Sequence, residues 1–118
     1  MMLAGELICE ISAILVHEAG HALAATVLGY KWTVGVARWH GVPAGPAIRV
    51  APSGRRDSAL IAVAAPVLNL AVGGASLYAA GFTGWVAVFG VFNVLFGLVS
   101  FVPVRGFDGR FVLDAVRG

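Results

Sequence analysis

The longest apolar stretch sets the strongest limit on how this chain can fold. Between Asp57 and Arg105 there is no charged residue, and the stretch is interrupted only by the glycine-containing segment AAGFTGW. A helix needs about 20 apolar residues to cross the hydrocarbon core of a bilayer. The stretch therefore predicts two membrane-spanning helices, near residues 58–80 and 84–103, joined by a short turn.

The N-terminal segment predicts a third span, over residues 3–29. Of the 118 residues, 59% are apolar and only 12% are charged, whereas soluble domains carry about 25% charge. A cleavable signal peptide would need a basic start, but Glu6 and Glu10 stand there instead. We therefore expect an all-α membrane protein whose single domain covers residues 1–118.

The basic residues all fall on one side of this three-span arrangement. The eight of them lie in the loop 30–57 or after the third span: Lys31, Arg38, Arg49, Arg55, Arg56, Arg105, Arg110 and Arg117. Basic loops stay in the cytoplasm, so we expect the N-terminus outside. A composition rich in Ala, Gly, Val and Arg, with one Lys, indicates a multi-pass protein of a prokaryotic cell membrane.

The loop 30–57 predicts some β-structure. In KWTVGVARW apolar and polar residues alternate, which is typical of a short strand, and AIRVA is a candidate for a second. Beyond the third span, Pro103 and Gly106 interrupt the helix. We expect residues 103–108 to be non-helical and to run back toward the first helix, and a short helix to follow over 109–117.

The first predicted span contains an HExxH pattern, formed by His17, Glu18 and His21. Residues four apart lie on one face of a helix, so both imidazoles can bind one metal ion while Glu18 serves as a general base. A charge at the centre of a membrane helix costs about 2.5–3.5 kcal/mol. A cluster of hydrogen bonds between helices is the structural alternative, but the pattern favours a Zn²⁺ site.

A third ligand does not follow from this pattern. Soluble zincins use a downstream Glu, or the His of HExxHxxGxxH. This chain has no Glu after Glu18, and Ala24 and Val27 stand where the longer pattern needs Gly and His. The candidates that remain are His40, Asp57, Asp108 and Asp114.

Among these candidates the local sequence favours Asp108. Asp57 fits better as the cap of the second span, and His40 fits a solvent-facing position in the loop. Asp108 follows the break at Pro103 and Gly106, which would let the chain turn inward.

Three stretches, in this order, resemble the site-2 protease family of intramembrane zinc metalloproteases. HEAGHALAA at 17–25 resembles the family's first motif, and AAPVLNLAV at 64–72 resembles its G-P-x-x-N stretch through Pro66 and Asn69. NVLFGLVSFVPVRGFDG at 93–109 resembles its Asn-rich helix, which leads to Leu-Pro and then Asp-Gly. The resemblance covers nearly the whole chain.

The resemblance implies a function and a set of site residues. Zinc would be bound by His17, His21 and Asp108, and Glu18 would be the catalytic base that activates a zinc-bound water. The substrate would be a transmembrane segment of another protein, cleaved within the lipid bilayer. We expect no nucleic-acid partner, and association with a second copy stays open.

The resemblance also points to substrate or oxyanion contacts at Asn69, Asn93 and Ser100. Ser100 stands where the family has Asn, eight residues before the aspartate, and Arg105-Gly106 replaces its Pro-Pro. For the two asparagines, hydrogen bonds between helices are an equal alternative. A degenerate zinc-binding membrane protein that acts only through helix–helix contacts is the second hypothesis, and a metal transporter is the third.

Overall fold

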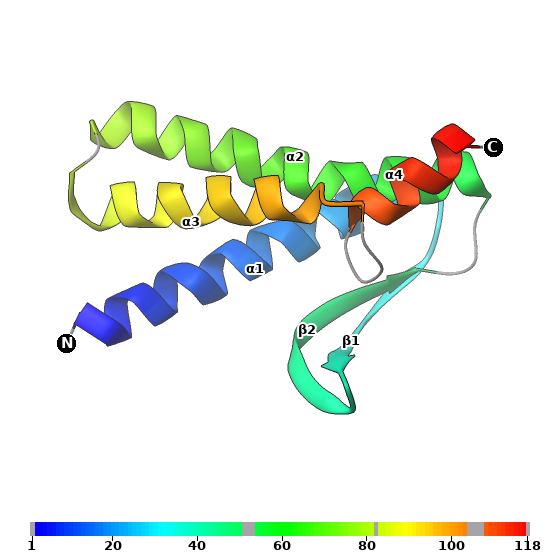
Figure 1. Cartoon of the computed structure of the whole chain (residues 1–118), viewed down its shortest axis with the longest axis horizontal. Coiled ribbons are helices and arrows are strands. Elements are labelled where there is room, and N and C mark those ends of the chain that lie inside the picture. The colour runs from blue at the N-terminus through cyan, green and yellow to red at the C-terminus, as the bar shows by residue number, and fades with distance from the viewer. Residues whose placement is uncertain (1, 51–53, 82, 104–107, 118) are drawn as a thin grey trace.

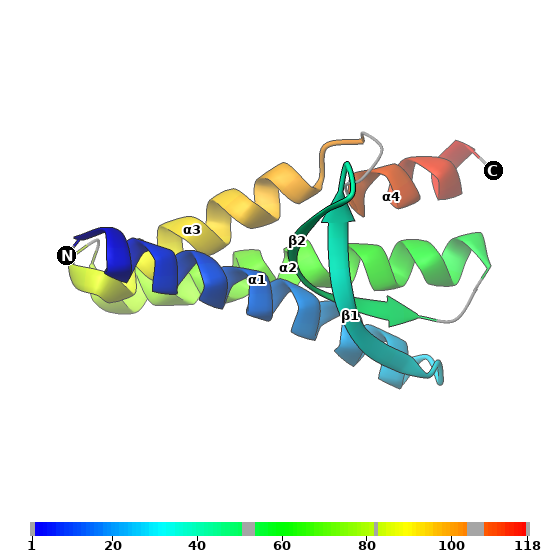
Figure 2. The same cartoon turned by 90° about the horizontal axis from the view of Figure 1, so that it is seen from below.

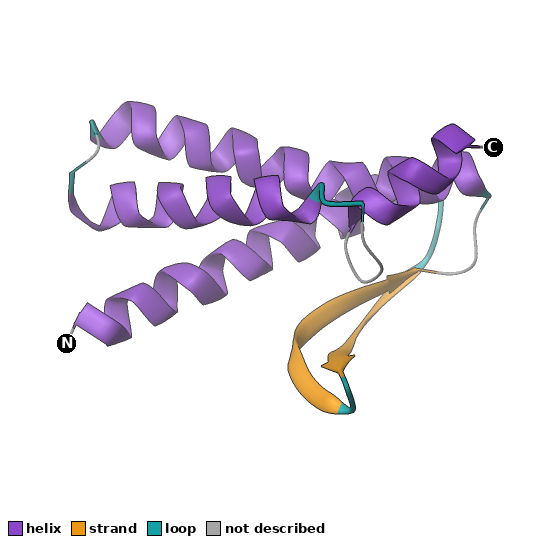
Figure 3. Ribbon diagram, viewed as in Figure 1, coloured by secondary structure: helices purple, strands orange, loops and turns teal. Residues whose placement is uncertain are grey.

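The computed structural model describes residues 2–50, 54–81, 83–103 and 108–117, and these form four helices and one β-hairpin. The elements follow each other as α1 (Met2–Val27), β1 (Trp32–Trp39), β2 (Val42–Val50), α2 (Arg55–Ala80), α3 (Gly84–Ser100) and α4 (Asp108–Arg117). The expectation of a mostly helical chain with a β-containing loop is thus confirmed (Figure 3).

The three long helices pack along the long axis of the molecule (Figure 1). α2 and α3 form an antiparallel pair, and α1 crosses both of them. The N-terminus and the turn between α2 and α3 lie at one end, whereas the start of α2 and the whole of α4 lie at the other. α4 packs against α2, so its first residue comes close to the middle of α1.

The helix ends differ from the sequence expectation in all four helices. α1 covers Met2–Val27 rather than residues 3–29. α2 begins at Arg55 rather than at residue 58, so Asp57 lies in its first turn instead of capping it; the N-cap is Gly54. A carboxylate is favourable in a first turn, and Asp57 also accepts a hydrogen bond of 2.6 Å from the Tyr30 hydroxyl. α3 ends at Ser100 rather than 103, and α4 starts at Asp108. Of the expected return loop 103–108, residues 104–107 lie outside the described part.

The loop between α1 and α2 forms an antiparallel hairpin that stands across α1 (Figure 2). In its register Val34 lies opposite Ile48, and a bulge interrupts the pairing between Ala37 and Arg38. The turn at the tip uses His40 and Gly41, both with positive φ. β1 covers the predicted segment KWTVGVARW except Lys31. β2 covers AIRV of the second candidate segment and begins earlier, at Val42, while Ala51 lies outside the described residues.

Close contacts between the helices depend on small side chains. A Cβ atom on Gly20 would lie 2.6 Å from the Cα of Ala65, and one on Gly73 would lie 2.7 Å from the carbonyl oxygen of Gly90. The first contact joins α1 to α2 and the second joins α2 to α3. Small residues at a crossing let two helices approach closely, as in membrane proteins.

Small apolar side chains lie in the interior and large ones on the surface, which is the reverse of the usual pattern in a soluble domain. The buried apolar residues are mostly alanines: Ala13, Ala22, Ala25, Ala62, Ala65 and Ala87. Large apolar side chains of the long helices are exposed, among them Leu7, Leu15, Leu23, Leu60, Leu95 and Leu98. α1 and α2 are long and apolar enough to cross a membrane by length and composition, and α3 is a shorter apolar helix.

Candidate metal centre

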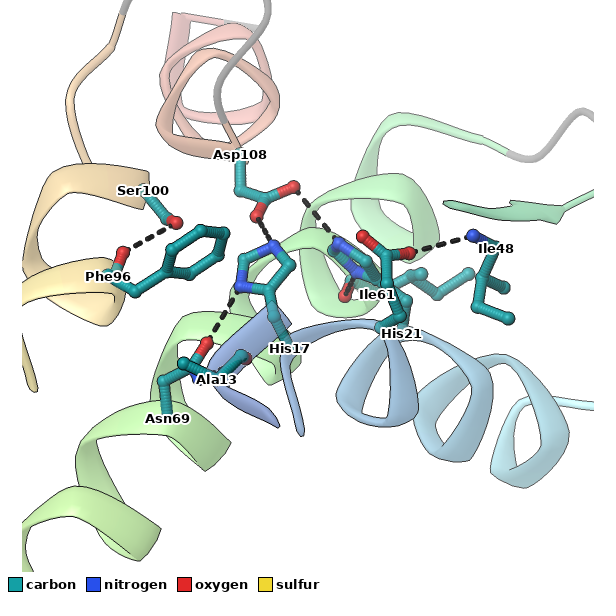
Figure 4. A network of polar contacts seen from close by, with 10 residues as sticks. Ala13, His17, His21, Ile48, Ile61, Asn69, Phe96, Ser100 and Asp108 are labelled. Atoms are coloured by element: carbon teal, nitrogen blue, oxygen red, sulfur yellow. Dashed lines mark hydrogen bonds and ion pairs between the residues drawn. The ribbon is translucent and has the colours of Figure 1, made fainter. Parts of the chain in front are cut away.

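The two histidines of the HExxH pattern face the same space on α1. His17 is buried, with 6% of its surface exposed, and His21 is partly buried. Their rings lie one helical turn apart, with centroids 4.8 Å from each other and planes perpendicular. The two imidazoles therefore lie on one face of α1, as their spacing predicts. Both Nε2 atoms point toward the start of α4 (Figure 4).

Asp108 brings a carboxylate to both imidazoles. Its Oδ2 lies 2.8 Å from Nε2 of His17, and its Oδ1 lies 3.3 Å from Nε2 of His21. The neighbouring Gly109 makes this approach possible, because a Cβ there would collide with the backbone carbonyl of Phe101. Without a side chain at that position, the first turn of α4 can pack directly against the end of α3.

The opposite nitrogen of each ring is held by an oxygen atom. Nδ1 of His17 lies 2.8 Å from Oδ1 of Asn69, and Nδ1 of His21 lies 2.9 Å from the backbone carbonyl of Ile61. Both oxygens can only accept, so each Nδ1 carries the hydrogen and donates it. The lone pair of Nε2 in each neutral ring then points at the Asp108 carboxylate. Metal-binding histidines have the same arrangement: Nδ1–H donates to an oxygen, and Nε2 is left to bind the metal.

These contacts fit a zinc ion. A lone pair on Nε2 and a carboxylate oxygen at 2.8 Å repel each other unless a proton or a cation lies between them. One ligand atom from each of His17, His21 and Asp108 can be chosen so that all lie within 4.8 Å of one another. In a tetrahedral site with bonds of about 2.0–2.1 Å, ligand atoms lie about 3.3 Å apart. Three ligands would leave a fourth position open, as in catalytic sites.

The charge on Asp108 suits this role. Burial raises the pKa of the Asp108 carboxyl group, but its contacts with the His17 and His21 rings lower it by more, so the pKa lies below its ordinary value. The carboxylate therefore stays ionised at neutral pH. Asp114, on the exposed side of the same helix, pairs instead with Arg110 at 3.3 Å, and Asp57 is bound by Tyr30.

Glu18 lies beside the ligands on the wall of a cavity of about 310 Å³. The lining includes the three candidate ligands and side chains from α3 and the hairpin: Ile14, His17, Glu18, His21, Ala37, Pro46, Phe96, Val99, Ser100 and Asp108. Oε2 of Glu18 accepts a hydrogen bond of 2.7 Å from the backbone N–H of Ile48 on β2. A carboxylate on the wall of a cavity that also holds three metal-ligand groups can accept a proton from a water molecule there.

The other candidate residues occupy two different positions. Asn69 and Asn93 are fully buried behind His17, where Asn69 Nδ2 donates to the carbonyl of Ala13 and to Oδ1 of Asn93. Ser100 does line the cavity, and its hydroxyl donates to the Phe96 carbonyl in its own helix. Of the three, only Ser100 therefore lines the cavity beside His17, His21 and Asp108.

Sequence reasoning did not find two contacts of the site. The Ile61 carbonyl and the Ile48 amide are backbone groups, so no side-chain pattern could indicate them. Nor was the bond between Asn69 and His17 foreseen, although an Asn buried in an apolar helix signals a polar partner.

A comparison of this sequence with protein-family models and with curated proteins found no match. The function of this chain must therefore be inferred from the residues of the site.

Proposed function

We propose that this chain is an intramembrane zinc metalloprotease of the site-2 protease type. The observation that carries the proposal is the approach of Asp108 to Nε2 of both histidines, with Glu18 on the wall of the same cavity. A purely structural zinc site has no use for a further carboxylate beside the ligands. A hydrolase needs one as its general base.

The membrane setting is supported by length and by surface. We propose that α1, α2 and α3 all span the bilayer. α3, with 17 residues, is about 26 Å long, close to the hydrocarbon thickness of about 30 Å. The exposed leucines of the long helices would face lipid, where they cost nothing, and the small residues would face other helices. The basic hairpin end would be cytoplasmic.

The ligands of the zinc would be His17, His21 and Asp108. When bound, zinc would polarise a peptide carbonyl and lower the pKa of a water molecule. The bonds from Asn69 and Ile61 would hold the two imidazoles in the tautomer that binds metal. Because two neutral histidines, Asp108 and Glu18 balance a doubly charged cation, such a site would carry no net charge inside the membrane.

Glu18 would move the proton. Its carboxylate would take a proton from the attacking water and later deliver it to the leaving amine. Ser100, on the same cavity wall, can accept a hydrogen bond from a substrate amide while its own hydrogen stays on the Phe96 carbonyl. The substrate we propose is a membrane-spanning segment of another protein, locally unwound so that its carbonyl can reach the site.

Water would enter from the cytoplasmic end. A second cavity, of about 270 Å³, reaches His21 and Asp108 from the side of α2 and α4, where Val50, Ser58 and Phe111 line it. These residues belong to the end of the molecule that carries the basic side chains. His21 lies about 9 Å along α1 from the helix end at Val27, so the path to it is short.

The test compares wild type with Glu18→Gln, purified in detergent micelles and loaded with zinc. Cleavage would be followed by mass spectrometry on dye-labelled casein and on a panel of single-span membrane peptides. We expect wild-type cleavage that a chelator abolishes, and a loss of about 10²–10⁴-fold in Glu18→Gln at equal zinc content. If the protein binds stoichiometric zinc but cleaves neither casein nor any membrane peptide, the protease proposal is overturned in favour of the non-catalytic zinc-binding protein. If the protein carries zinc across liposome membranes and Glu18→Gln retains this flux, a transporter is favoured.

A further inference from the structure

The contact between Glu18 and the hairpin joins the proposed general base to a single backbone group. The N–H of Ile48 donates to Oε2 of Glu18 at 2.7 Å, and the two residues come from β2 and α1. A glutamate side chain has three rotatable bonds, and fixing them costs conformational entropy. A bond to one carboxylate oxygen restricts these rotations and leaves the other oxygen to accept a proton.

The hairpin register makes this donor specific. Because the Ile48 N–H points toward α1, its pair with Val34 is of the type without ladder hydrogen bonds. Orientation along a strand alternates, so Pro46, opposite Val36, has the same orientation as Ile48. A proline has no N–H to offer. Beside the cavity, the edge of β2 therefore has a carbonyl without a donor at 46 and a donor at 48.

We propose that the backbone N–H of Ile48 is the positioning group for Glu18, so that the placement of the hairpin sets how well the base works. This inference rests on the proposed function. The strand β2 contacts α1 at Glu18 itself. A shift of β2 along α1 would turn the carboxylate without disturbing the bonds that hold His17 and His21.

Removal of this one donor is the first test. Ile48→Pro deletes the N–H, and at this edge position it should leave the ladder to β1 in place; Ile48→Val serves as its reference, because it alters the side chain and keeps the N–H. The matched control is Val34→Pro, which deletes the amide that points out of the opposite edge of the hairpin. Cleavage of dye-labelled casein and zinc content would be measured for all of them.

We expect Ile48→Pro to lower kcat by about tenfold or more relative to Ile48→Val, with KM and zinc content unchanged, and Val34→Pro to keep the wild-type kcat. Equal kcat values for Ile48→Pro and Ile48→Val would overturn the positioning role while leaving the protease proposal intact. A rise in KM together with the fall in kcat, or equal losses in Val34→Pro, would also overturn it, because general distortion of the hairpin would then be the cause.

A second measurement does not depend on activity. Hydrogen exchange at the Ile48 amide would be followed by NMR in zinc-loaded wild type and in Glu18→Ala. We expect exchange there to accelerate about tenfold or more, whereas the Thr33 amide, which faces β2 in the ladder, should not change. Unchanged exchange at Ile48 would overturn the contact itself. This readout remains decisive even if wild type cleaves nothing, so failure of the proposed function and failure of this inference can be told apart.

Discussion

His17 and Asn69 are joined by a hydrogen bond of 2.8 Å between Nδ1 and Oδ1, and this bond connects α1 to α2 directly behind the candidate metal centre. Nδ2 of Asn69 also donates to Oδ1 of Asn93 on α3, and Nδ2 of Asn93 donates to the Phe89 carbonyl. A chain of hydrogen-bonded side chains thus runs across three helices and ends on the imidazole of His17. His17, Asn69 and Asn93 thus form hydrogen bonds with one another, so these buried side chains have polar partners in an apolar interior.

Replacement of Asn69 by Leu should weaken zinc binding by about 10–100-fold, as is usual when the partner behind a ligating histidine is lost. The imidazole of His17 would lose the acceptor that fixes its tautomer and ring orientation. Chelator competition would measure the affinity. Ser76→Ala is the matched control, since the Ser76 hydroxyl donates to the Val72 carbonyl in the same helix. An unchanged affinity in a folded Asn69→Leu protein would contradict the role assigned to this bond.

Asp108→Ala should abolish stoichiometric zinc binding, and Asp114→Ala should not. Both aspartates lie on α4, but only Asp108 contacts the imidazoles; Asp114 forms an exposed pair with Arg110, and such pairs contribute about 0–1 kcal/mol. Metal analysis of the purified proteins would test the difference. Full zinc occupancy in Asp108→Ala would remove this residue from the ligand set.

Gly109→Ala should lower zinc affinity although no ligand is changed. The new Cβ would collide with the Phe101 carbonyl, so α4 would have to shift and carry Asp108 with it, at a cost of about 1–3 kcal/mol for overpacking. Gly74→Ala in α2 is the control, because a Cβ there meets no atom within 4 Å. Chelator competition and thermal unfolding should leave Gly74→Ala at or above wild type. Equal zinc affinities in the two variants would mean that the position of α4 does not depend on Gly109.

The orientation of the chain can be tested by labelling from outside intact cells. In a background in which Cys9 is replaced by Ala, a cysteine at Thr83 should react with an impermeant thiol reagent and a cysteine at Arg38 should not. The reason is that the hairpin end carries the basic residues, which stay in the cytoplasm. Permeabilised cells, in which both positions should react, provide the control, and the reverse pattern in intact cells would invert the proposed topology.

Much of the helical framework could be predicted from hydropathy and turn residues. The uncharged stretch before Arg105 and the glycine-containing interruption near Gly81 located α2 and α3, because a long apolar run and its break are local properties. The ends were less predictable. Hydropathy excluded Arg55 and Arg56 from α2 although both are helical, since hydropathy marks only the apolar part of a helix and charged residues can still form its first turn.

By itself the sequence determined which residues could bind a metal on one helix. His17 and His21 share a face of α1 because the helical repeat is fixed, and Glu18 must lie next to them for the same reason. The helical repeat of α1 could not identify the third ligand, because that residue comes from another segment. Elimination left four candidates, and their contacts depend on where distant segments pack: Asp57 is bound by Tyr30, Asp114 by Arg110, and only Asp108 reaches the two rings.

Tertiary structure alone decided what holds the site in place. The acceptors behind the imidazoles come from Asn69 and the Ile61 backbone on α2, and the donor to Glu18 comes from the Ile48 backbone on β2. Backbone groups are present at almost every position, so the sequence cannot indicate which of them will point at a given side chain. That depends on the crossing of α1 with α2 and on the register of the hairpin, both of which are set by packing between segments far apart in the chain.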